Sequence, residues 1–219
     1  MAIKPILFNK QISTEMVRAI LDGRKTCTRR LVKFLPGENS KWTGYIKDGL
    51  MLYNGRNEPC IRNAPYQPGD ILYVRETWCA LPVNEAGHMR GHSIYYYRAD
   101  GDLRPEGWRG KWRPSTQMPK EAARIWLWVT DVMVERLQDI TYNGALREGS
   151  EGIRCDHVAL GVHGCTDCMN TGWIEPPQVE FMQIWNSTIK KSNLDRYGWD
   201  ANPWVWVIEF ERCEKPEGV

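Results

Sequence analysis

Apolar residues recur at helical spacing in two stretches of the chain. The first stretch covers residues 13–21, where Ser13 or Thr14 can cap a short helix and Gly23 can end it. The second covers residues 178–190 and predicts a longer amphipathic helix. Its expected inward positions are Phe181, Met182, Trp185 and Ile189.

Longer apolar and aromatic runs predict the strands. Residues 67–70, QPGD, form a strong turn signal, and the run that follows predicts a strand over residues 71–78. Further runs of high strand propensity cover residues 94–98, 124–136 and 203–210. Apolar residues occupy both odd- and even-numbered positions of residues 124–136, which indicates a strand that is largely buried on both faces.

The order of these elements predicts the fold class. Residues 141–148 favour a short helix, so the order is helix, strands, two helices and a final strand. This order suits an α+β fold built on a small β-barrel with flanking helices. A length of 219 residues favours a single domain, residues 1–219, with a Gly- and Cys-rich insert at residues 150–176.

Composition and charge narrow the function classes. The net charge is only +2, so any nucleic-acid footprint must be local. No stretch reaches the roughly 18–20 apolar residues of a membrane span, and the N-terminal residues lack the pattern of a signal peptide. We therefore expect a cytoplasmic protein with no membrane partner, in which the seven cysteines are reduced.

Positive charge is concentrated directly after the first predicted helix. Five of the ten residues from Arg24 to Lys33 are basic, which is the local density that phosphate binding needs. We expect Arg24, Arg29 and Arg30 to contact a nucleotide or RNA. The alternative is a solvated turn whose arginines lie over apolar surface.

Four motifs resemble the ASCH domain family of the PUA-like superfamily. They are DGRKTCTRR at residues 22–30, PGD followed by YVRETW at residues 68–78, RLQDIT at residues 136–141 and NPWVWVIEF at residues 202–210. The resemblance implies a PUA-like barrel with a cleft for RNA or a modified nucleoside. The length and the Trp-rich close look like the ASCH proteins of tailed phages and prophages, which implies a bacterial host cytosol.

One branch of that family consists of amidohydrolases that deacetylate N4-acetylcytidine, and its catalytic set matches Lys25, Thr28 and Glu148 here. The resemblance implies Lys25 as general base, Thr28 as nucleophile and Glu148 as the orienting or proton-relaying group. Residues three apart in a strand face opposite sides, so Lys25 and Thr28 converge only if the chain bends. The alternatives are phosphate contacts by Lys25 and Thr28 in a non-catalytic binding module, or a phage interaction protein.

Glu76 is a carboxylate inside a predicted strand, with Trp78 close by. Together they could recognise a base edge in the binding site. An internal pair between Glu76 and an arginine is equally expected.

The insert carries a C-x-x-C pair, Cys165 and Cys168, whose spacing suits one tetrahedral zinc ion. Cys155, with His157 or His163, could complete the ligands, so we expect a structural zinc site. The H-x-E motif of zinc deaminases is absent from the sequence, which disfavours that activity. An incidental cysteine-rich loop is the alternative for the insert.

Overall fold

The structure is a computed structural model that contains two compact units. It describes residues 1–8, 12–32, 45–47, 51–53, 64–82, 93–107, 110–156 and 172–218. The first unit comprises Met1–Asp22, Gly69–Trp128 and Glu211–Val219, and the second comprises Gly23–Pro68 and Val129–Phe210. The prediction of a single domain stays a prediction, because strands β8 and β11 run through both units.

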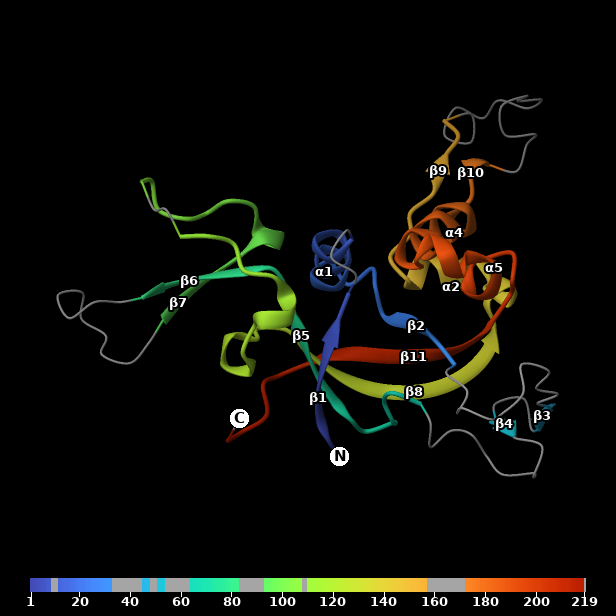
Figure 1. Cartoon of the computed structure of the whole chain (residues 1–219), viewed down its shortest axis with the longest axis horizontal. Helices are drawn as coiled ribbons and strands as arrows, with labels where there is room; N and C mark the ends of the chain where they lie inside the picture. The colour runs from blue at the N-terminus through green and yellow to red at the C-terminus, as the bar shows by residue number, and fades with distance from the viewer. Residues whose placement is uncertain are drawn as a thin grey trace. The chain divides into compact units, whose positions relative to one another are not determined.

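The main sheet has five strands in the order β1-β5-β8-β11-β2 (Figure 1). The strands are β1 (Ile3–Leu7), β2 (Cys27–Leu31), β5 (Ile71–Arg75), β8 (Trp126–Arg136) and β11 (Trp204–Cys213). Strands β1 and β5 are parallel, whereas β5–β8 and β11–β2 are antiparallel. Closure would need the end strands β1 and β2 to pair, but in the described ranges each pairs with a single inner neighbour. The α+β class is confirmed, and the expectation of a closed barrel is wrong for the described residues.

The first unit contains helix α1 (Ser13–Leu21) and the hairpin of β6 (Trp78–Pro82) and β7 (Ser93–Tyr97). The predicted strand 71–78 breaks between β5 and β6, where the amide of Glu76 donates to Met118 Sδ at 3.1 Å. Short 3-10 helices follow at Arg98–Asp100, Ser115–Gln117 and Lys120–Ala122.

Helix α1 confirms the first apolar stripe but not its predicted cap. The N-cap is Ile12, which makes no side-chain cap hydrogen bond, and Ser13 lies buried within the helix. The expectation that Ser13 or Thr14 caps the helix is therefore wrong. Gly23 follows the helix with φ of 76°, a conformation that glycine adopts without strain, as predicted.

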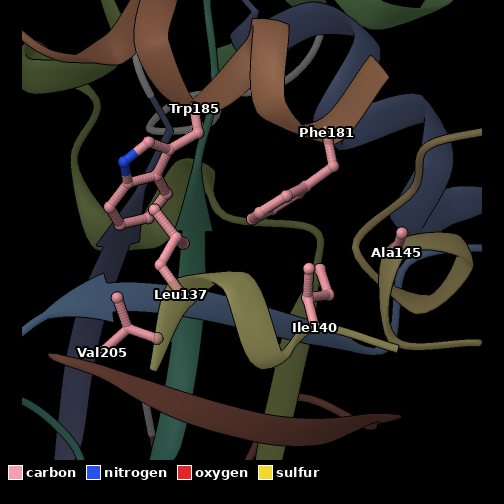
Figure 2. Packing of buried hydrophobic residues seen from close by; sticks show 6 residues of the cluster. All are labelled: Leu137, Ile140, Ala145, Phe181, Trp185 and Val205. Atoms are coloured by element: carbon pink, nitrogen blue, oxygen red, sulfur yellow. The ribbon is translucent and has the colours of Figure 1, made fainter. Parts of the chain in front are cut away.

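The second unit contains helices α2 (Tyr142–Arg147), α4 (Pro177–Thr188) and α5 (Leu194–Tyr197). Helices α2 and α4 pack on strand β11 through a cluster of buried side chains (Figure 2). Its members are Leu137, Ile140, Ala145, Phe181, Trp185 and Val205. Thr141 caps α2, because its Oγ1 accepts a 3.0 Å hydrogen bond from the Gly144 amide. The predicted helices 141–148 and 178–190 are confirmed.

The remaining elements of the second unit are short. Two hairpins pair β3 (Tyr45–Lys47) with β4 (Met51–Tyr53) and β9 (Ile153–Arg154) with β10 (Trp173–Glu175). The 3-10 helices are Leu137–Asp139 and Lys191–Asn193. None of the helices in the described ranges is long and apolar enough to cross a membrane.

Candidate functional site

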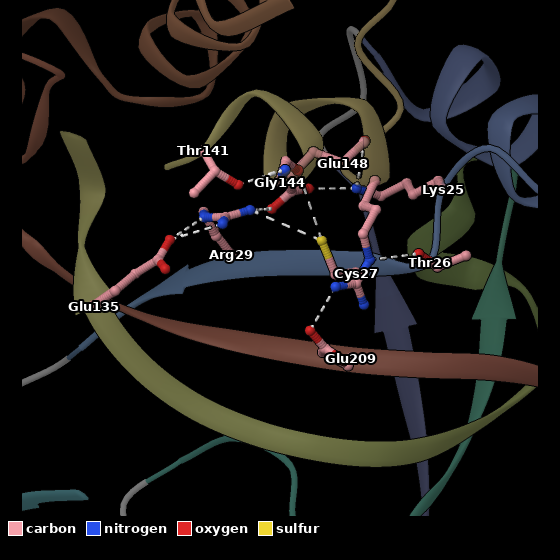
Figure 3. Close-up of polar contacts among 10 residues, drawn as sticks. Lys25, Thr26, Cys27, Arg29, Glu135, Thr141, Gly144, Glu148 and Glu209 are labelled. Carbon is pink, nitrogen blue, oxygen red and sulfur yellow. Dashed lines mark hydrogen bonds and ion pairs between the residues drawn. The ribbon is translucent and has the colours of Figure 1, made fainter. Parts of the chain in front are cut away.

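Lys25 and Glu148 meet in the second unit, although 123 positions separate them in the sequence. Lys25 lies two residues before strand β2, and Glu148 is the C-cap of helix α2. The Lys25 ammonium lies 2.5 Å from Glu148 Oε2 and also donates to the Glu148 backbone carbonyl at 2.7 Å (Figure 3). The two residues are only 3% and 6% exposed, so the ion pair belongs to the interior.

Arg29 joins this pair from strand β2. Its Nη1 lies 3.3 Å from Glu148 Oε1, and its Nε donates to Glu135 Oε1 on strand β8 at 2.7 Å. Burial lowers the pKa of the Arg29 guanidinium, but Glu148 and Glu135 outweigh burial and the net shift is upward. Gly144 lies against the same group, since a Cβ at Gly144 would stand 3.1 Å from Arg29 Nη2. Arg29, which the sequence predicts to contact phosphate, is thus held between the buried carboxylate of Glu148 and the partly buried carboxylate of Glu135.

Thr28 is buried on the other face of β2. Side chains alternate along a strand, so Thr28 faces away from Cys27 and Arg29. The strand register agrees, because Arg29 lies opposite Val207 and Thr28 lies opposite Ile208. The structure therefore brings together two of the three residues of the predicted catalytic set, and places Thr28 behind the strand.

The other two arginines of the basic run lie closer to solvent. Arg24 Nη1 lies 2.9 Å from Glu151 Oε1 in an exposed ion pair. Arg30 is half-buried and lies opposite Trp206 in the register, on the same face of β2 as Thr28. The alternative of a solvated turn is wrong for Cys27–Leu31, which form strand β2 with Arg29 buried on one face and Arg30 half-buried on the other.

Sequence reasoning missed three charged residues of this network. They are Glu135, Arg147 and Glu209. Arg147 Nη1 lies 2.8 Å from Glu209 Oε1, and Arg147 Nε donates to Thr26 Oγ1 at 3.1 Å. A usable signal existed, because Glu135 and Glu209 are acidic residues inside the apolar runs that became β8 and β11.

Cys27 lies in the middle of these charges. Its thiol is 4.0 Å from the Gly144 carbonyl oxygen and 3.8 Å from Arg29 Nη1. Burial and the Glu148 carboxylate raise the pKa of the Cys27 thiol to about 12, although Lys25, Arg29 and Arg147 oppose the shift. Cys27 is therefore a buried neutral thiol and not an activated nucleophile.

We expect Cys27 to be inert in the native protein, because the thiolate is the reactive form and a pKa of about 12 leaves almost none at about pH 8. The native protein and the Cys27→Ser variant should consume equal amounts of an aromatic disulfide reagent. In urea the native sequence should consume one equivalent more. A fast-reacting native thiol that the variant lacks would contradict this expectation.

Glu76 and Trp78 lie in the first unit, inside its packing. Glu76 is 1% exposed and accepts two 3.0 Å hydrogen bonds from Arg124, which also binds Asp100 at 2.7 and 2.9 Å. The expected internal pair between Glu76 and an arginine is therefore present. Burial raises the pKa of Glu76 against the opposing effect of Arg124, and Trp78 is part of a buried cluster with Met118.

Most of the predicted zinc ligands lie outside the described residues. These are His157, His163, Cys165 and Cys168. Cys155 is described and buried. Within the described ranges no three His, Cys, Asp or Glu side chains form a group that could hold a metal ion. The zinc site stays a prediction.

Comparison of the chain with models of protein families, with curated proteins and with solved structures gave no match. The chemistry of the site therefore rests on its own geometry. A lysine, an arginine and two carboxylates in contact can hold and pass a proton, or stabilise charge that forms on a bound molecule.

Proposed function

We propose that this chain is a PUA-like protein of the ASCH type that binds a modified nucleoside and hydrolyses an acyl amide on it, with N4-acylated cytidine as the substrate class. The contact between Lys25 and Glu148 carries the proposal. The resemblance assigns these two residues to one site, and they are in contact although 123 positions separate them in the sequence.

The pair has the chemistry that amide hydrolysis needs. A nucleophile must lose a proton as it attacks the acyl carbonyl, and the leaving amine must gain one. For this, Lys25 first passes a proton to Glu148 Oε2, 2.5 Å away. The neutral amine can then take the proton of the nucleophile and return it to the leaving amine. The acyl group then leaves as a carboxylate when water resolves the acyl-enzyme, and the nucleoside keeps its amine.

Two threonine hydroxyls are candidates for the nucleophile. Thr28 matches the family pattern but lies on the face of β2 opposite Arg29. Thr26 is partly exposed and accepts a hydrogen bond from Arg147. A non-catalytic nucleoside-binding module is the second candidate function, and the position of Thr28 favours it.

The test is incubation of the purified chain with a panel of modified nucleosides, followed by mass analysis of the products. We expect N4-acetylcytidine to give cytidine and acetate. A Thr28 nucleophile predicts that Thr28→Val, which keeps the side-chain shape, abolishes turnover, while Thr28→Ser retains part of it. Thr26→Val tests the second candidate, and the exposed Thr116→Val is the matched control. Turnover lost only in Thr26→Val would move the nucleophile to Thr26.

Binding without turnover of any nucleoside in the panel would establish the binding-module function instead. Absence of both binding and turnover across the panel would overturn the proposal.

A further inference from the structure

Positive charge is concentrated in one segment of the first unit. Residues 93–128 contain seven basic and four acidic side chains, although the whole chain carries only +2. The segment includes strand β7 and the connection to β8. None of its residues belongs to the Lys25 site.

Three arginines of this segment stack on tryptophan rings. The guanidinium carbons of Arg98 and Arg104 lie 5.4 and 4.7 Å from the ring centre of Trp112, and that of Arg113 lies 5.3 Å from the ring centre of Trp78. We call these five residues the arginine–tryptophan surface. A guanidinium held against an indole keeps its N–H edge free for bidentate contact with phosphate. Its outer face can also stack on a base.

The three arginines differ in the number and strength of the ion pairs and hydrogen bonds that their guanidinium groups make within the protein. Arg104 is paired with Asp102 through contacts of 2.6 and 2.7 Å and also donates to the Gly110 carbonyl. Arg98 meets Asp102 only at 4.0 Å, and both side chains are about half exposed, so this pair is weak. Arg113 is exposed and takes part in no ion pair among the described residues. Arg98 and Arg113 are therefore oriented cations that can take a further anion.

The two tryptophans hold unused hydrogen-bond donors. The Nε1 atoms of Trp78 and Trp112 are buried and have no acceptor in the described part of the chain. Buried indole N–H groups ordinarily find a partner. Trp78 is only 4% exposed, and Arg113 covers its ring. Because both N–H groups are buried, the groups that a phosphate can contact are the exposed guanidinium edges of Arg98 and Arg113.

We propose that the arginine–tryptophan surface binds single-stranded nucleic acid, with Arg98 and Arg113 contacting phosphates and stacking against bases. Single strands are favoured over duplexes because stacking on the arginines needs bases whose faces are free. This site is separate from the Lys25–Glu148 pair, and its existence does not depend on the proposed hydrolysis.

Fluorescence anisotropy of the full chain with labelled 12-nucleotide strands, as RNA and as DNA, tests the proposal. We expect saturable binding that is tighter for a single strand than for the duplex of the same sequence. Arg98→Gln and Arg113→Gln should each weaken binding about three- to tenfold. Each should also reduce the slope of log affinity against log salt by about 0.7, the value for one lost phosphate contact on a single strand.

Arg196→Gln is the matched control, because Arg196 is an exposed arginine stacked on Tyr197 at 5.0 Å in the second unit. It removes the same charge and should change affinity less than about twofold, as expected for general electrostatics alone. Equal losses in Arg196→Gln and Arg98→Gln would overturn the proposal, as would equal affinity for single strand and duplex. Displacement of the strand by an equal concentration of polyglutamate would assign the surface to an acidic polypeptide. Loss of nucleoside hydrolysis in Thr28→Val with strand binding intact would separate the two sites.

Discussion

Glu148→Ala should lower the free energy of unfolding by about 3–5 kcal/mol, because it leaves two buried cations without their shared carboxylate. Lys25 would lose its carboxylate partner while its ammonium still donates to the backbone carbonyl of residue 148, and Arg29 would lose one of its two carboxylate partners and keep Glu135. Neither cation can be hydrated in place, since both are buried. Urea unfolding monitored by circular dichroism measures the change.

Glu151→Ala is the control for this variant. Glu151 is also paired with an arginine, Arg24, but its side chain is 67% exposed, so the loss should stay within about 1 kcal/mol. A further variant separates charge from packing. Lys25→Met combined with Glu148→Leu removes both charges and should unfold at a higher urea concentration than Glu148→Leu alone. Similar losses in Glu148→Ala and Glu151→Ala would show that the buried pair contributes no more than a surface pair.

The elements with long apolar runs could be predicted from the sequence, because burial dictates their pattern. Strand β8 and helix α4 lie within two residues of their predicted bounds. Strand β2 could not be predicted in this way, because three of its five residues are polar or charged. Its polar side chains are accommodated by partners distant in sequence, such as Glu135 and Glu148 for Arg29, and no local pattern reveals such partners.

The candidate site, too, could be predicted only in part from the sequence. The resemblance named Lys25 and Glu148, and a tertiary contact of 2.5 Å joins them. The resemblance gave Thr28 as the third member. Side chains alternate between the two faces of β2, so the face on which Thr28 lies depends on where the strand begins. Glu135 reaches Arg29 only because the sheet brings strands β8 and β2 close together. The sequence pattern alone does not predict which strands lie close together.

Arg124→Met should destabilise the first unit by about 3–5 kcal/mol near pH 7, because Glu76 would then be a buried carboxylate without a cation. Burial and the Asp100 carboxylate both raise the pKa of Glu76, and Glu76 in turn raises the pKa of Tyr97. Arg124 alone opposes them. Removal of Arg124 should therefore move the pKa of Glu76 further above its ordinary value.

The sign of the pH dependence follows from that upward shift. A carboxyl whose pKa is higher in the folded state than in the unfolded state binds its proton more tightly when folded. The folded Arg124→Met variant can hold Glu76 as the neutral acid near pH 4–5, close to the ordinary glutamate pKa of about 4.3, and there the stability loss should be smallest. The loss should grow as the pH rises and level off once the pH exceeds the raised pKa of Glu76. Urea midpoints measured across about pH 4.5–8 for the native sequence and the variant test this directly.

Arg98→Met, which removes an exposed arginine of the same unit, should give a small loss that does not vary with pH. A loss in Arg124→Met that is equally large at both ends of the range would show that the ionisation of Glu76 is not its cause.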